Sequence, residues 1–207
     1  MPTPEITLHG TELSGHCHRV ELMLRMLGLP YRYVVAPAAV RNSAEFHQLN
    51  PLRQIPVLQD GEVTLADSNA ILVYLAKRYA PGSHWLPEEP VAAAQVQRWL
   101  SIAAGEVRYG PATARMVALW NFPGDPARAK QIAAALLPFM NQHLSTRSFL
   151  AADHATIADL ACYSYVAHAP EGGIALGEYE AVLAWLRRVE ALAHFKPIPP
   201  SPIPATT

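Results

Sequence analysis

The sequence NPLRQIPVLQDGEVTLADSNAILVYL, residues 50–75, contains the most informative structural pattern of this chain. Apolar and β-branched residues at 55–58 and 63–65 predict two short strands, and the Asp-Gly pair between them predicts a two-residue hairpin turn. Asp67 and Ser68 directly precede an apolar repeat with helical spacing. The stretch therefore predicts a β-hairpin that is followed at once by an amphipathic helix.

Two features of this stretch suit the binding of a small zwitterionic peptide. Pro56 has no N–H and cannot lie inside a paired ladder, and a cis bond before it would leave the N–H and C=O of Ile55 free to pair with the backbone of a ligand. The free N–H groups at a helix N-terminus attract a carboxylate near Ser68, and Asp67 can bind an ammonium group beside it. The alternative is a hairpin and a capped helix that bind nothing.

The composition predicts a folded protein that binds small molecules. Of the 207 residues 51% are apolar and 16% are charged, which is enough apolar material to bury a core in one large domain or two small ones. A net charge of −1 offers no attraction to nucleic acid or to an anionic membrane, so we expect neither partner. We also expect a cytoplasmic location, because the chain shows no signal peptide and no membrane span, and Cys17 and Cys162 form no disulfide framework.

The first half of the chain predicts the element order βαβ-ββα. Strands at 6–9 and 31–35 flank an apolar helical repeat at 16–27. Residues 36–49 fit either a loop or a weak helix. With the hairpin and helix described above, this order predicts an α/β thioredoxin-like domain over residues 1–79.

The second half predicts an all-α domain. The segment APGSHWLPEEP, residues 80–90, holds three prolines and a glycine and predicts a linker. Beyond it, over residues 91–207, the strand signals disappear. Helical patterns cover 91–120, with a bend near Gly110-Pro111, and 125–144, with a kink at Pro138. A Thr156/Asp159 capping box opens a further helix, and the last helical pattern covers 179–192. An extended tail follows over 197–207.

The motif N-P-x-x-Q-I-P-V-L at 50–58, followed by D-S-N-A-I-L-x-Y-L, closely resembles the glutathione-binding half of cytosolic glutathione S-transferases. The later T-I-A-D-L segment is similar to the capping element of that family's helical domain. The resemblance implies glutathione as co-substrate, with Ile55, ahead of a cis Pro56, pairing with its cysteinyl backbone and with Asp67 and Ser68 holding its γ-glutamyl end. It also implies a homodimer, as in family relatives.

The loop L-S-G-H-C-H-R-V, residues 13–20, looks like the S-G-N-x-x-K-V element of many bacterial transferases. The resemblance implies that the Ser14 hydroxyl stabilises the glutathione thiolate, which then attacks a hydrophobic electrophile. A thiol pKa near 8.5 falls by about two units for about 2.7 kcal/mol of preferential thiolate stabilisation, which a hydroxyl and a helix N-terminus can supply. The alternative is that Ser14 only caps the helix. His16 stands where the Asn would be, so no sulfur contact is carried over to it.

Cys17 is the competing candidate for a reactive thiol. If the helix terminus and His18 or Arg19 lowered its pKa, the protein would be a glutathione-dependent thiol-disulfide oxidoreductase. Its position matches the more buried cysteine of a C-x-x-C motif without a partner cysteine, which favours a packed, inert thiol. His16, Cys17 and His18 diverge on a helix, so we expect no metal site. A third alternative is a transferase-like fold that binds glutathione without catalysis.

Further candidates surround these residues. Gln54 and Arg53 lie next to Ile55 and could bind the glycine carboxylate of glutathione, with Arg41 as a weaker candidate. The electrophile is expected between the two domains. The candidates for that site are Leu13, Tyr109, Trp120 and Phe122, with Arg108 or Arg115 to polarise a leaving group, and core packing is the alternative for each aromatic.

Overall fold

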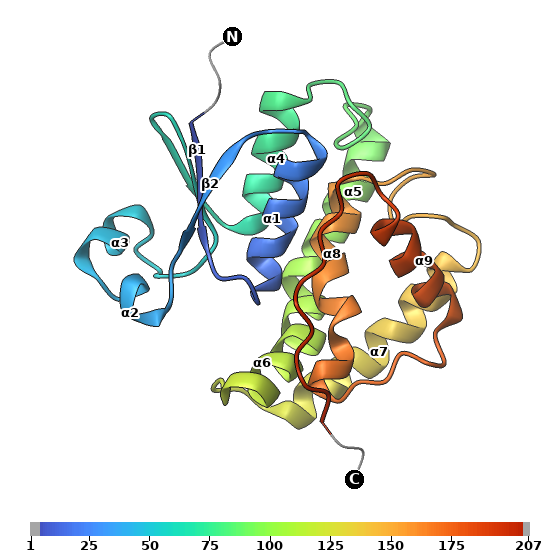
Figure 1. The fold of residues 1–207 in the computed structure, drawn as a ribbon. Helices are drawn as coiled ribbons and strands as arrows, with labels where there is room; N and C mark the ends of the chain where they lie inside the picture. Colours follow the sequence, from blue (N-terminus) through green and yellow to red (C-terminus); the bar gives the residue numbers. More distant parts are fainter. Residues whose placement is uncertain (1–4, 205–207) are drawn as a thin grey trace.

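A four-stranded mixed sheet and a bundle of helices pack side by side in this protein, of which a computed structural model describes residues 5–204 (Figure 1). The sheet has the order β2-β1-β3-β4, with β1 and β2 parallel and β3 antiparallel to both of its neighbours. The strands are β1 (Ile6–Gly10), β2 (Tyr31–Val35), β3 (Val57–Asp60) and β4 (Val63–Ala66). The predicted fold class, an α/β thioredoxin-like half followed by an all-α half, is confirmed.

The helices of the first half cover the sheet from two sides. α1 (Gly15–Met26) and α4 (Ser68–Tyr79) lie on the face toward the helical half, and α2 (Ala38–Arg41) and α3 (Ala44–Leu49) lie beyond the opposite face (Figure 1). The segment that the sequence left open as loop or weak helix therefore forms two short helices. Phe46 of α3 packs with Ala36 and Val57 in a small apolar cluster, separate from the main core.

The hairpin differs from its prediction by one or two residues at three of its four strand boundaries, and β4 begins at Val63 as predicted. β3 begins at Val57 rather than at residue 55, because Pro56 has no N–H to donate to a strand ladder. Asp60 pairs with Val63, so the loop consists of Gly61, at φ 56°, and Glu62, and the predicted Asp60-Gly61 turn is wrong by one residue. The Asp60 carboxylate accepts hydrogen bonds from the hydroxyls of Tyr74 and Tyr79, which fasten the hairpin to α4.

All the regular secondary structure of the second half, over the described residues 90–204, is helical. The pattern at 91–120 forms one continuous helical run that changes from α to π geometry at Ala103 and returns to α geometry after Ala112, directly beyond the predicted bend at Gly110-Pro111. A Cβ atom at Gly110 would lie 3.1 Å from the backbone nitrogen of Ala133, so glycine allows α7 to approach here. The helices are α5 (Pro90–Ile102), the π-helix η1 (Ala103–Ala112), α6 (Thr113–Trp120), α7 (Pro126–Leu144), α8 (Ile157–Ala167), the 3₁₀ turn η2 (Ala169–Gly172) and α9 (Glu180–Glu190).

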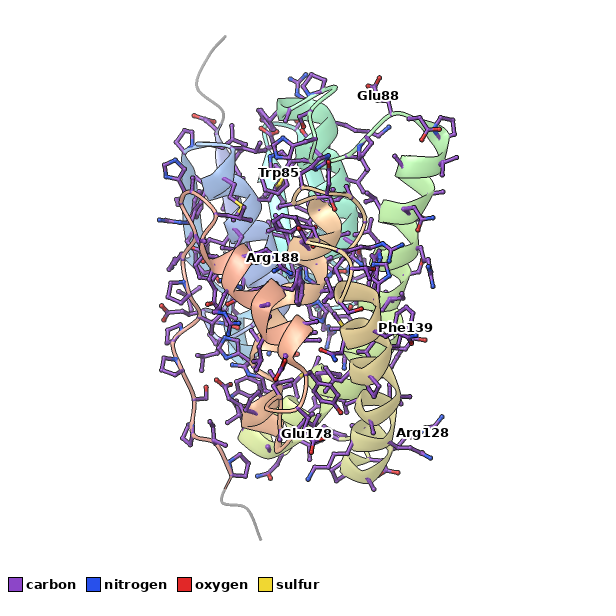
Figure 2. The ribbon with its side chains drawn as sticks, turned by 90° about the vertical axis from the view of Figure 1, so that its right-hand side faces the viewer. Trp85, Glu88, Arg128, Phe139, Glu178 and Arg188 are labelled. Atoms are coloured by element: carbon purple, nitrogen blue, oxygen red, sulfur yellow. The ribbon has the colours of Figure 1, made fainter. Side chains whose placement is uncertain are left out.

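α8 lies at the centre of the molecule. It contacts α1 and α4 of the first half and α5 and α9 of the second, and ten of its eleven residues are buried. The predicted capping box opens it, since Thr156 N–H donates to Asp159 Oδ2 at 2.9 Å and Thr156 Oγ1 accepts from Ala158 N–H. α7 and α9 form the outer face, where Phe139 and Arg188 reach the surface (Figure 2).

The segment after α9 returns to the first half of the molecule. His18 Nε2 on α1 donates to the Lys196 carbonyl at 2.6 Å, and Lys196 Nζ donates to Glu21 at 3.0 Å. Residues 197–204 are free of helix and strand, as predicted for the tail, whose residues 205–207 lie outside the described range. Within residues 5–204 no helix is both long enough and apolar enough to cross a membrane.

Candidate active site

Ser14 ends the loop between β1 and α1 and is the N-cap of α1. Its backbone is extended, at φ −80° and ψ 117°, and its Oγ accepts the N–H of Cys17 at 3.3 Å. The capping role considered as the alternative is therefore present. It does not exclude the other role, because a hydroxyl that accepts one hydrogen bond still has its proton to donate.

Asp67 and Ser68 stand at the N-terminus of α4. Asp67 is the N-cap, with φ 71°, and its Oδ1 accepts from Asn69 N–H and Ala70 N–H, both at 2.9 Å. Both bonds use Oδ1, so Oδ2 takes no part in the cap. Asp67 is exposed and Ser68 is buried, so an exposed carboxylate lies beside a buried hydroxyl at this helix start.

A chain of polar contacts joins the starts of α1 and α4. His16 Nδ1 lies 3.3 Å from Ser68 Oγ, and Arg19 Nη1 donates to the same Oγ at 3.2 Å. Arg19 Nη1 also donates to Asn69 Oδ1 at 2.8 Å. The first turns of α1, which Ser14 caps, and of α4, which begins at Ser68, are thus held together.

Arg19 gives this cluster a buried positive charge. Its side chain is 1% exposed, and within the described part of the chain Nε and Nη2 have no hydrogen-bond partner. Burial lowers the pKa of the Arg19 guanidinium, while the Asp67 carboxylate is among the groups that oppose this change. Burial and the charges of Arg19 and Arg108 lower the pKa of His16 well below its usual value, so His16 is neutral. A buried cation without an ion-pair partner favours an anion nearby.

The Ile55–Pro56 peptide bond is cis, as predicted. Asn50 shapes the turn ahead of it, because its Nδ2 donates to the Gln54 carbonyl at 2.9 Å and its carbonyl accepts from Arg53 N–H at 2.8 Å. Arg53, at φ 55°, and Gln54 are both exposed, so either side chain is free to meet a ligand. Arg41 ends α2 and keeps its Nε buried without a partner among residues 5–204.

Cys17 is enclosed by its neighbours. Its side chain is 1% exposed, and burial raises the pKa of its thiol to about 11. The packing is tight, since a Cβ atom at Gly10 would lie 2.7 Å from Cys17 Sγ. A buried thiol with a raised pKa is a poor nucleophile, which argues against the oxidoreductase hypothesis.

The residues considered for an electrophile site separate into two groups. Tyr109, Trp120 and Phe122 are 61%, 48% and 40% exposed, and Leu13 is half-buried. The Arg108 guanidinium lies 5.7 Å from the ring centroids of both Tyr109 and Phe122. Arg115 is fully buried in an ion pair with Glu171, so it is not available to polarise a leaving group.

Sequence reasoning missed the environment beneath the site. Tyr165 of α8 lies against the start of α1, where a Cβ atom at Gly15 would be 2.8 Å from its ring, and its ring is 5.0 Å from that of His16. No local sequence pattern predicts the contacts of Tyr165 with Gly15 and His16, because the two segments are far apart in the chain. Arg19 did carry a signal, since it shares the buried face of α1 with Met23, one turn later. Within residues 5–204 no three His, Cys, Asp or Glu side chains are grouped to hold a metal ion.

Comparison with known proteins identifies the family. Residues 8–84 match the model of the glutathione S-transferase N-terminal domain, and residues 124–193 match that of the C-terminal domain. Glutathione S-transferase theta-3 of Mus musculus is 30% identical over 192 residues, which cover 86% of this chain and 79% of the mouse protein.

Solved structures agree with these matches. The glutathione S-transferase of Pseudomonas fluorescens superimposes with a TM-score of 0.87 at 31% identity, covering 93% of this chain and 98% of that one. A glutathione transferase homologue of Drosophila mojavensis, solved with bound glutathione, gives a TM-score of 0.80 at 26% identity, covering 92% and 89%. On its sequence, its two-part fold and the paired helix starts, this chain belongs to the glutathione S-transferase family.

Proposed function

We propose that this protein is a glutathione transferase that binds glutathione across the starts of α1 and α4. The γ-glutamyl carboxylate lies at the N-terminus of α4 beside Ser68, and the γ-glutamyl ammonium binds Asp67 Oδ2. The backbone of Ile55, ahead of Pro56, pairs with the cysteinyl residue. The glycine carboxylate is held by Gln54, with Arg53 beside it.

The observation that carries this proposal is the buried Arg19 behind Ser68. A guanidinium that is 1% exposed and has no ion-pair partner among the described residues lies one hydrogen bond from the helix start that would receive a carboxylate. Helix N-termini attract anions through free N–H groups, and the Arg19 charge acts in the same direction. A carboxylate at Ser68 would compensate the buried charge, so the site favours an anionic ligand.

The chemistry is activation of the ligand's own thiol. The Ser14 hydroxyl donates a hydrogen bond to the sulfur, and with the N-terminus of α1 it favours the thiolate over the thiol. The thiolate forms a bond to the electrophilic carbon of a hydrophobic substrate, and the electron pair of the broken bond leaves with the leaving group or stays on the adduct. Leu13, Tyr109 and Trp120 supply the apolar contact for that substrate.

Calorimetric titration with glutathione tests the binding half of this proposal. Asp67→Asn keeps a good N-cap and removes the charge, so it should leave stability nearly unchanged and weaken glutathione binding by about tenfold or more. Asp125→Asn is the matched control, since Asp125 caps α7 with the same pair of hydrogen bonds and should bind glutathione like the wild type. Equal affinity in the two variants, or no binding by the wild type at millimolar glutathione, would refute the assignment.

We also infer that the protein is a homodimer in which α4 and α5 contribute to the interface. A surface cavity of about 710 Å³ between these helices is lined mostly by apolar and small residues, including Val73, Ala76 and Ala94, together with Lys77, Glu88 and Gln97. Light scattering should give twice the chain mass, and Ala94→Arg should give monomers. Ala135→Arg, on the exposed side of α7, is the control that should stay dimeric. A wild-type monomer at micromolar concentration would contradict the inference.

Two further expectations belong with this proposal. We place the domain division in residues 80–90, supported by the absence of helix and strand from residues 80–89 between α4 and α5. We place the protein in the cytoplasm, supported by two buried cysteines that are both free.

A further inference from the structure

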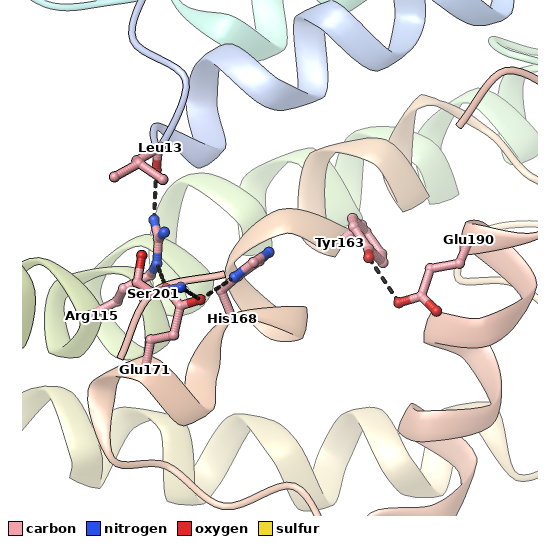
Figure 3. Close-up of polar contacts among 7 residues, drawn as sticks. All are labelled: Leu13, Arg115, Tyr163, His168, Glu171, Glu190 and Ser201. Atoms are coloured by element: carbon pink, nitrogen blue, oxygen red, sulfur yellow. Dashed lines mark hydrogen bonds and ion pairs between the residues drawn. The ribbon is translucent and has the colours of Figure 1, made fainter. Parts of the chain in front are cut away.

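Arg115 of α6 connects the helical half to the loop that carries Ser14. The side chain is fully buried, and its Nε lies 2.5 Å from Glu171 Oε2 (Figure 3). Its Nη1 donates to the carbonyl oxygen of Leu13 at 2.7 Å. One guanidinium therefore joins a buried carboxylate in η2 to the residue that precedes Ser14.

Glu171 is itself held from two further directions. Its Oε1 accepts the backbone N–H of Ser201 at 3.0 Å and lies 2.7 Å from His168 Nδ1. Burial alone would raise the pKa of Glu171, but the hydrogen bonds from His168, Arg115 and Ser201 lower it. The carboxylate is thus ionised and fixed, and it holds Arg115 in one orientation.

The contact with Leu13 completes the hold on a single peptide unit. The Ser14 N–H donates to the Thr11 carbonyl at 3.1 Å, and the Leu13 carbonyl of the same peptide unit accepts from Arg115. Both polar atoms of the unit that leads into Ser14 are therefore bonded. Because the peptide unit is planar, fixing its two ends fixes the N–Cα bond of Ser14, and the hydrogen bond from Cys17 N–H to Ser14 Oγ then restrains the side chain.

We propose that Arg115 is a positioning residue that sets the direction of the Ser14 hydroxyl from the helical half of the molecule. This inference rests on the role proposed above for Ser14. In this role Arg115 orients Ser14 and does not polarise a leaving group. Ser201 contributes indirectly, because its N–H bonds Glu171, which in turn holds Arg115.

Stability alone does not account for this arrangement. A buried ion pair contributes little net stability compared with apolar residues of similar size, whereas the Leu13 carbonyl needs a donor at a defined place. The guanidinium is suited to this task because its donors form a rigid fork that can bond two acceptors at once. A lysine ammonium at the same position would have to serve both acceptors from one nitrogen.

The test is the pKa of the thiol of enzyme-bound glutathione, measured from thiolate absorbance against pH, together with the glutathione Kd and the unfolding midpoint. Arg115→Met combined with Glu171→Gln removes the donor without leaving a buried charge unpaired, and Gln keeps an acceptor for Ser201. We expect this double variant to fold, to bind glutathione within about twofold of wild type, and to raise the bound-thiol pKa by about one unit. Arg115→Lys should give a smaller rise, and it serves as the test if the double variant fails to fold.

Glu190→Gln is the matched control, because Glu190 accepts a hydrogen bond from Tyr163 at 2.9 Å in the same half of the molecule, away from the Leu13 loop (Figure 3). It should leave the bound-thiol pKa unchanged. A folded double variant, or a folded Arg115→Lys if that is the one available, with wild-type thiol pKa would overturn the proposal. Ser14→Ala separates the two hypotheses: if it also leaves the thiol pKa unchanged, the role of Ser14 fails, and if it raises the pKa, only the positioning role fails.

Discussion

Ser14 combines a structural and a proposed chemical role in one hydroxyl group, and a comparison with Ser43 can separate them. Ser43 caps α3 by accepting Phe46 N–H at 3.2 Å, close to the 3.3 Å of the bond that Ser14 makes, but it lies outside the proposed site. Each Ser→Ala change should cost about 1 kcal/mol of stability as a lost cap. Only Ser14→Ala should also lower kcat/KM for an electrophile that the wild type accepts, by about tenfold or more. Equal kcat/KM in the two variants would leave Ser14 with the cap alone.

Cys17 provides a second test at the scale of a single residue. Because its thiol is buried with a pKa raised to about 11, it should take no part in the reaction. Cys17→Ala should therefore retain transferase activity within about twofold while it loses about 1 kcal/mol or more of stability through the lost packing. Activity and unfolding are measured on the same preparation. A complete loss of activity in a folded Cys17→Ala protein would favour the oxidoreductase hypothesis instead.

At the scale of elements, the capping box of α8 does more than start a helix. Asp159 is buried, accepts from Thr156 N–H with one oxygen, and accepts from Leu150 N–H and Trp185 Nε1 with the other, both at 2.9 Å. The sequence shows the first contact only, from which a cost of about 1 kcal/mol follows. The structure shows a junction of α8, α9 and the loop before α8.

Thr156→Ala and Asp159→Ala should therefore differ in stability. Thr156→Ala loses a cap and should cost about 1–2 kcal/mol. Asp159→Ala leaves three buried N–H donors without an acceptor and should cost about 3 kcal/mol or more of stability. Urea denaturation of both variants gives the comparison. Equal losses would mean that the contacts of Asp159 with Leu150 and Trp185 contribute nothing.

Periodicity and capping patterns predicted most elements because both are local. Gly28, two residues after α1, the Asp125-Pro126 pair that opens α7, and the Thr156 capping box of α8 each lie within a few residues of the boundary that they define. The two short helices at 38–49 were left open because neither is long enough to show a helical period. The sequence predicts the binding motif for the same reason, because Asp67 and Ser68 are adjacent.

At the scale of the whole molecule, the contacts that join distant segments could not be predicted from the sequence. Arg115 bonds Glu171, and His18 bonds the Lys196 carbonyl, although the partners are 56 and 178 positions apart in the sequence. Local sequence patterns cannot predict contacts over such separations. The sequence predicts only that the tail over 197–207 is extended; the structure adds that Lys196, just before it, binds α1 and that Ser201 N–H donates to Glu171. The support of the candidate site is therefore a property of the tertiary fold, although its binding residues are local.

His18 makes the stability of the whole molecule depend on pH. Its Nε2 donates to the Lys196 carbonyl, so Nδ1 is the acceptor for the Ser164 hydroxyl at 2.8 Å. Burial lowers the pKa of His18 to about 4, from an ordinary value of 6.5, although the Lys196 carbonyl and Glu21 oppose this change. Between these values the unfolded chain binds a proton that the folded chain excludes, so stability falls as the pH decreases.

The loss attributable to His18 should reach about 3 kcal/mol between about pH 6.5 and pH 4. His18→Gln keeps a donor and an acceptor and removes the titration. The slope of unfolding free energy against pH should therefore be shallower in this variant by up to about 1.4 kcal/mol per pH unit. Urea denaturation across this pH range measures it. Identical slopes in the variant and the wild type would show that folding does not prevent the protonation of His18.

The proposed activity depends on a lowered pKa of the bound glutathione thiol, which titration of that thiol measures. Thiolate absorbance of the wild-type complex should show a pKa about two units below the value near 8.5 of a free thiol, and Ser14→Ala should return it most of the way. Saturating glutathione keeps the measurement independent of affinity and of the electrophile. A bound thiol that titrates like the free one would contradict thiol activation by this protein, and a pKa that is the same in wild type and Ser14→Ala would contradict the role of Ser14.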